Sequence, residues 1–157
     1  MQKSSATPIL DLNNVGKVFP RPESGGSWTV LENIDLQVRP GEFISLLGRS
    51  GSGKSTLLRI AAGLTNPSVG SVKCSGEELL GVNPDVAMVF QSFALLPWLT
   101  VLDNVTIKKK KKMPQSEKED IAYDAIKVVG LSGFENAYPK ELSGGMQQRV
   151  GFARAFV

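Results

Sequence analysis

The spacing of the apolar positions along the chain changes near its middle. Before Gln91, short β-rich stretches are separated by Asn, Gly, Pro and Ser, which predicts strands at residues 9–12, 17–19, 29–31, 34–38 and 71–76. The first four are expected to form a small antiparallel β region. Two continuous apolar runs, residues 42–47 and 85–90, predict compact buried strands.

Helical spacing appears first at residues 54–64, where leucines and alanines recur on one face and a glycine follows. It returns over residues 117–131 and again after Ser143. Because strands dominate before Gln91 and helices after it, we expect two parts, residues 1–91 and a helical subdomain of residues 92–157.

The loop between the predicted strand at 42–47 and the helix at 54–64 carries candidate chemistry. Residues 48–55 fit the pattern G-x-x-x-x-G-K-[ST] in the strand, loop and helix context that the pattern requires. Glycines let consecutive backbone N–H groups wrap a phosphate chain, and the start of a helix offers further N–H groups and a positive dipole end. The pattern therefore predicts binding of a nucleoside triphosphate.

Lys54 argues against a purely structural helix start, because a lysine there opposes the helix dipole unless an anion is bound. The Ser55 hydroxyl is suited to Mg²⁺, which prefers oxygen ligands and bridges protein and phosphate oxygens. The predicted contacts to ATP from this loop are Gly48, Arg49, Ser50, Gly51, Ser52, Gly53, Lys54, Ser55 and Thr56.

A second candidate anion site begins the last helix. Ser143 is a good N-cap, yet Gly144 and Gly145 follow in the first turn, where each costs roughly 1 kcal/mol relative to alanine. One interpretation is another bare helix N-terminus that holds a phosphate. The other is a loose loop that enters a helix.

These motifs resemble those of ATP-binding cassette (ABC) proteins. The stretch "LSGGMQQR", residues 142–149, looks like their signature sequence, and the glycine loop resembles their Walker A motif. Gln91 after a strand resembles their Q-loop, and "GKVF" resembles the segment whose aromatic residue stacks on adenine. That residue would be Phe19, with Trp28 as the competing aromatic. The stretch "LLPWLTVLDNV", residues 95–105, and Met146 are further similar to importer ATPases for nitrate, sulfonate and taurine.

The resemblance implies an α/β P-loop NTPase fold of the ABC type, in which residues 1–91 are the N-terminal part of the nucleotide-binding core. It implies catalytic roles for Lys54 and Gln91, with Gln91 and Ser55 at Mg²⁺. It also implies a head-to-tail dimer with a second copy, whose nucleotide is contacted in trans by Ser143, Gly144, Gly145 and Gln147.

The same resemblance implies a peripheral subunit at the cytoplasmic face of the inner membrane, docked on a permease and served indirectly by an external solute-binding protein. Residues 93–98 are candidates for an exposed docking patch, although core packing explains them equally well. No nucleic-acid partner is expected.

Two family elements are absent from the sequence, an Asp-Glu pair after four apolar residues and a later histidine; the chain has no histidine at all. Asp85 is no substitute, because it precedes its predicted strand and ligands bind beyond the carboxyl ends of strands. We therefore expect the chain to be the first two-thirds of an ABC domain, without the C-terminal part of its core and marginally stable alone. Hydrolysis by this chain stays open.

Composition changes this picture little. The net charge is +3, and the run of five lysines at 108–112 supplies more than that, so the remainder is net −2. Such a run is a solvated segment or a contact to an anionic surface, and it lacks the interleaved aromatics of a nucleic-acid site. No apolar run approaches the roughly 20 residues of a membrane span, and no secretory leader is evident. The single Cys74 fits a reducing cytoplasm.

Three hypotheses about the function remain. A fourth, a small-molecule kinase that shares only the glycine loop, is the least favoured. The first is the energy-coupling ATPase subunit of an importer. The second is a nucleotide-binding protein without hydrolysis. The third is a soluble cassette protein that acts on nucleic acid or ribosomes, to which the lysine run would contribute.

Overall fold

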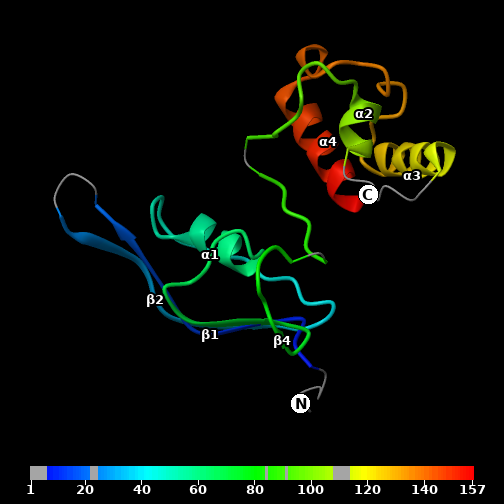
Figure 1. The fold of residues 1–157 in the computed structure, drawn as a ribbon. Coiled ribbons are helices and arrows are strands. Elements are labelled where there is room, and N and C mark those ends of the chain that lie inside the picture. Colours follow the sequence, from blue (N-terminus) through cyan, green and yellow to red (C-terminus); the bar gives the residue numbers. More distant parts are fainter. Residues whose placement is uncertain (1–6, 22–24, 84, 91, 108–113) are drawn as a thin grey trace. The chain divides into compact units, whose positions relative to one another are not determined.

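The computed structural model describes residues 7–21, 25–83, 85–90, 92–107 and 114–157. The chain divides into two compact units, Met1–Val86 and Ala87–Val157, which are described separately below. The first unit is a sheet with one helix, and the second is a group of helices (Figure 1). The predicted functional boundary at Gln91 stays a prediction, since Gln91 and the lysine run lie outside the described residues.

The sheet of the first unit has four strands in the order β2-β1-β3-β4. They are β1 (Leu10–Pro20), β2 (Ser27–Val38), β3 (Val69–Cys74) and the short β4 (Glu77–Glu78). β1 lies in the middle and pairs antiparallel with both β2 and β3. The predicted antiparallel β region and the strand near 71–76 are therefore confirmed.

Irregularities in the ladder keep one face of the sheet apolar. Asn14 and Asn33 adopt left-handed backbone conformations, with φ of 47° and 49°, where the register between β1 and β2 shifts. An extra residue in a strand keeps the residues on either side of it on the same face. Leu12 and Val15 are therefore both fully buried although they are three positions apart.

Helix α1 (Lys54–Ala61) covers this face (Figure 1). Its Leu57 and Ile60 pack with Leu12, Leu31 and Val72 of the strands into the core of the unit. The helix begins at the predicted residue and ends slightly earlier than predicted, before Gly63 with φ of 69°. The predicted helix is present and its Leu57 is buried as expected, but Leu58 and Leu64, also expected on the apolar face, are exposed, and Ile60 is buried instead.

The two predicted buried strands are not formed. Residues 42–47 and 86–90 carry no strand, and Phe43 and Leu47 are 93% and 92% exposed. A strand requires a neighbour that pairs with its backbone N–H and C=O groups, and neither run has a ladder partner among the described residues. The prediction was wrong for this structure because an apolar run specifies burial but does not supply the strand that must lie beside it.

The second unit is helical, as expected for residues 92–157. It contains α2 (Val101–Thr106), α3 (Gln115–Val128), a short 3₁₀ turn η1 (Pro139–Glu141) and α4 (Gly144–Phe156). The predicted helix over 117–131 corresponds to α3. The core of this unit consists mainly of small and branched apolar side chains: Val101, Val105, Ala122, Ala125, Ile126, Leu131, Leu142, Val150 and Ala153. In the described part of the chain, no helix is long and apolar enough to cross a membrane.

One buried polar side chain organises the segment before α2. Asn104 is fully buried, and its Oδ1 accepts a hydrogen bond from the backbone N–H of Leu96 at 2.8 Å. Its Nδ2 lies 2.9–3.1 Å from the carbonyl oxygens of Leu96, Leu99 and Thr100. This side chain therefore pairs the Leu96 N–H and the Leu99 carbonyl, and it adds a second donor to the Leu96 and Thr100 carbonyls.

We predict that Asn104→Ala lowers the free energy of unfolding of this unit by about 2 kcal/mol, because it leaves buried backbone groups without partners. Urea titration followed by Trp98 fluorescence, in a Trp28→Phe background, measures the change. Asn136→Ala is the matched control, since Asn136 is exposed in the same unit and its truncation should cost at most about 0.5 kcal/mol. Equal effects of the two substitutions would contradict this role of Asn104.

Candidate functional site

The glycine loop at residues 48–53 leads directly into α1, and the first residue of that helix reaches back over it. Lys54 Nζ donates hydrogen bonds to the carbonyl of Gly48 at 2.8 Å, the carbonyl of Arg49 at 2.7 Å and Ser52 Oγ at 3.2 Å. The ammonium group is therefore held within the loop. This is a point charge placed where a phosphate chain wrapped by the loop would lie.

The start of α1 is left open for an anion. Its N-cap is Gly53, with φ of 88°, no side-chain cap and no acidic residue in the first turn. A Cβ at this position would lie 2.8 Å from Leu31 Cδ2 and 2.9 Å from the Val30 carbonyl, so β2 requires glycine here. The N–H groups of the first turn and the positive end of the helix dipole thus remain available to a ligand.

The remaining predicted loop residues have the exposure that a ligand site needs. Arg49, Ser50, Gly51, Ser52 and Ser55 are exposed, while Thr56 is half-buried. No cluster of three or more His, Cys, Asp or Glu side chains that could hold a metal exists among the described residues. Ser55 as one Mg²⁺ ligand beside phosphate oxygens stays a prediction.

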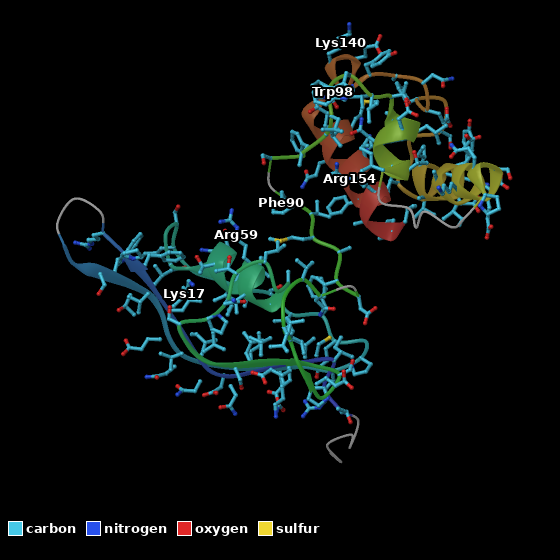
Figure 2. All side chains as sticks on the ribbon, in the orientation of Figure 1. Lys17, Arg59, Phe90, Trp98, Lys140 and Arg154 are labelled. Atoms are coloured by element: carbon cyan, nitrogen blue, oxygen red, sulfur yellow. The ribbon has the colours of Figure 1, made fainter. Side chains whose placement is uncertain are left out.

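The two competing aromatic residues are neighbours. Phe19 and Trp28 lie directly opposite each other in the β1–β2 ladder, so their side chains leave the same face of the sheet. Lys17 lies opposite Leu31, which packs under α1, and Lys17 Nζ sits 5.2 Å from the Phe19 ring centroid and donates to the Asn66 carbonyl at 2.7 Å (Figure 2). Both aromatics therefore lie on the α1 face, as an adenine platform requires.

The second candidate site, at the start of α4, is built as predicted. Ser143 is the N-cap, and its Oγ accepts a hydrogen bond from the Met146 N–H at 3.3 Å. Gly144 and Gly145 form the exposed first turn, and nothing lies within 4 Å of the position a Cβ would take at Gly145. The turn therefore presents bare backbone, as a phosphate contact would need.

The Gln147 side chain, unlike the exposed Ser143, Gly144 and Gly145, is hydrogen-bonded to neighbouring backbone carbonyls. Its Nε2 donates to the carbonyls of Pro139 at 2.9 Å and Leu142 at 3.2 Å, so this amide ties the η1 turn to α4. Its predicted contact with nucleotide in trans stays a prediction, as does every role of Gln91.

Sequence patterns did not identify the hydrogen bond from Lys17 to the Asn66 carbonyl or those from Arg154 to the Phe93 and Ala94 carbonyls, because both side chains bind backbone groups distant in sequence.

The comparisons with known proteins agree with this geometry. Residues 31–157 match the family described as "ABC transporter". A nitrate import ATP-binding protein of Synechocystis is 44% identical over 151 residues, covering 94% of this chain and 22% of that protein. A bicarbonate transport ATP-binding protein of the same organism is 45% identical over 152 residues, covering 95% of this chain and 53% of that protein.

A solved dimeric bacterial ABC transporter cassette is 36% identical, with a TM-score of 0.82 over 93% of this chain and 68% of that chain. The same cassette has been solved in a post-hydrolysis state bound to ADP and Pi, with the same TM-score of 0.82. This chain spans about half of the bicarbonate relative and less of the nitrate relative. The fold is the α/β P-loop fold of these cassettes, and with a family match that spans residues 31–157 the chain belongs to the ABC transporter family.

Proposed function

We propose that the chain is the ATP-binding part of an ABC importer subunit that couples ATP binding and hydrolysis to solute uptake. The observation that carries this proposal is the Lys54 ammonium held over a glycine loop at an uncapped helix start. The names of the nitrate and bicarbonate relatives support the transport role, and the ADP-bound cassette supports nucleotide chemistry.

In this proposal the residues of the glycine loop bind the phosphates. Backbone N–H groups of the loop and of the first turn of α1 donate to phosphate oxygens, and Lys54 neutralises charge on the β- and γ-phosphates. Ser55 would hold Mg²⁺, which supplies charge neutralisation when it is bound. Phe19 and Trp28 stack on adenine, and Gln91 orients water or Mg²⁺.

A second copy of the chain completes each nucleotide site in the proposed head-to-tail dimer. The bare turn at Ser143, Gly144 and Gly145 would donate backbone N–H groups to the phosphates held by the partner's glycine loop. This arrangement would give a role to both glycine-containing helix starts, which lie in separate units of one chain. The dimeric state of the solved cassette supports it.

The proposed solute is an anion of the nitrate, bicarbonate, sulfonate or taurine type. Relatives named for nitrate and for bicarbonate are 44% and 45% identical, so similarity alone favours neither. We place the subunit peripherally at the cytoplasmic face of the inner membrane, with its helical unit against a permease that receives solute from an external binding protein. Trp98 is 69% exposed on that unit and is available for such a contact.

The second candidate function is nucleotide binding without turnover. It concerns the 157 residues alone, which contain no histidine and span about half of the bicarbonate relative. Release of inorganic phosphate from ATP, measured on the purified chain, separates the two. Turnover that is lost in Lys54→Ala supports the ATPase, whereas ATP binding without turnover supports the alternative for this chain.

We predict that Lys54→Ala weakens ATP binding by at least about tenfold, because it removes the charge-assisted hydrogen bonds to the phosphates. Isothermal titration with ATP measures the affinity. Lys73→Ala removes an exposed lysine of the same unit and should leave the affinity unchanged. Equal affinities for wild type and Lys54→Ala, with both chains folded, would overturn the proposed site.

We predict that Phe19→Ala and Trp28→Ala each weaken ATP binding by roughly 5- to 100-fold, the usual range for loss of one base-stacking ring. ATP should also quench Trp28 fluorescence in a Trp98→Phe background. Val18→Ala is the control, because Val18 lies between Lys17 and Phe19 and alternates to the other face of β1. An unchanged affinity in both aromatic variants would remove the adenine platform.

We predict that Ser143→Arg leaves ATP binding by the single subunit intact and prevents ATP-driven dimerisation, because a bulky cation then fills the bare turn. Size-exclusion chromatography with light scattering, with and without a non-hydrolysable ATP analogue, measures association. Ser132→Arg, at an exposed loop position of the same unit, is the control. A normal dimer of Ser143→Arg would contradict the role of the second site.

A further inference from the structure

One side chain near the end of α4 holds the backbone that follows position 91. Arg154 Nη1 donates to the Ala94 carbonyl at 2.7 Å, and Arg154 Nη2 donates to the Phe93 carbonyl at 3.1 Å (Figure 2). The planar guanidinium presents its donors in a fixed fork. Two adjacent carbonyls bound by one fork are therefore fixed in orientation as well as in position.

The backbone that Arg154 holds is in an unfavourable conformation. Ala94 has φ of 49°, in the left-handed region that residues with a Cβ rarely adopt. Such a conformation persists only where contacts from outside the segment determine it. The two hydrogen bonds from Arg154 are contacts of this kind.

The same segment runs close along α4 toward the bare turn at Ser143. A Cβ at Gly151 would lie 3.6 Å from Val89 Cγ1 and 3.9 Å from the Phe93 carbonyl oxygen. A Cβ at Gly144 would lie 3.8 Å from Phe93 Cζ. Phe93 thus lies with its ring near the first turn of α4 and with its carbonyl beside Gly151, where Arg154 from the last turns of the helix donates to it.

We infer that Arg154 is a positioning residue for the candidate phosphate site at the start of α4. By fixing the Phe93 and Ala94 carbonyls it keeps the Phe93 ring against Gly144, and so limits the movement of the turn that would meet a partner's nucleotide. We call the hold of Arg154 on the Phe93 and Ala94 carbonyls the clamp. The clamp is a property of the helical unit, whereas its effect on dimerisation rests on the proposed function.

Amide hydrogen exchange on the full chain tests the clamp. Arg154→Ala should speed exchange of the Leu96 amide, which donates to Asn104 Oδ1, by at least about tenfold, since the segment loses the contacts that hold it closed. Arg154→Lys keeps the charge but replaces the fork with a point donor, and it should retain intermediate protection.

Arg149→Ala is the matched control. Arg149 lies on the same helix and also donates to two carbonyls, those of Val129 and Gly130, which follow α3. It should speed exchange near residues 129–134 and leave residues 92–96 unchanged. An unprotected Leu96 amide in wild type, no change in Arg154→Ala, or the same change in both alanine variants would overturn the clamp.

The functional consequence has its own readout. Arg154→Ala should leave the Kd for ATP within about twofold and weaken ATP-driven self-association by at least about tenfold, because only the second site is disturbed. Undiminished association of Arg154→Ala would overturn its role at that site. A wild-type chain that binds ATP without associating would refute the proposed dimer instead, and the exchange result would still decide the clamp.

Discussion

The first unit is organised around one electrostatic constraint, a lysine ammonium at the positive end of a helix. Lys54 is the first residue of α1, where the dipole disfavours a cation, and three oxygen acceptors of residues 48–52 hold its Nζ. Those acceptors compensate the local repulsion only in part, because each is neutral. An anion bound by the loop would satisfy Lys54 and the open N–H groups together, so the arrangement is more complete with a phosphate than without one.

The second unit also has a helix start with exposed backbone N–H groups, but there a side chain caps the helix. Ser143 supplies a side-chain cap to α4 and leaves the two glycines after it bare, so the cap and the exposed backbone share one turn. Gln147 ties the turn to η1 through the Pro139 and Leu142 carbonyls, and in the inferred clamp Arg154 supports it through Phe93. A helix start that holds a ligand in one position needs such support, because glycines in its first turn destabilise the helix.

What could be predicted from the sequence was the part encoded over a few residues. The glycine loop, the helix that begins at Lys54 and the Ser143 cap each follow from local spacing, and each is present. The strands expected at 42–47 and 85–90 depend on neighbours elsewhere, which an apolar run does not specify. Long-range contacts such as those of the Arg154 guanidinium could not be predicted either, because their acceptors are backbone carbonyls, which every residue carries.

The unpaired run at 42–47 also bears on how the glycine loop holds its shape. Leu47 directly precedes Gly48 and is 92% exposed, and the described residues form no strand on that side of the loop. The loop nevertheless keeps its Lys54 contacts and its close approach to Val30 and Leu31 through Gly53. In the described part of the chain, the conformation of the loop therefore depends on the glycines, on Lys54 and on β2.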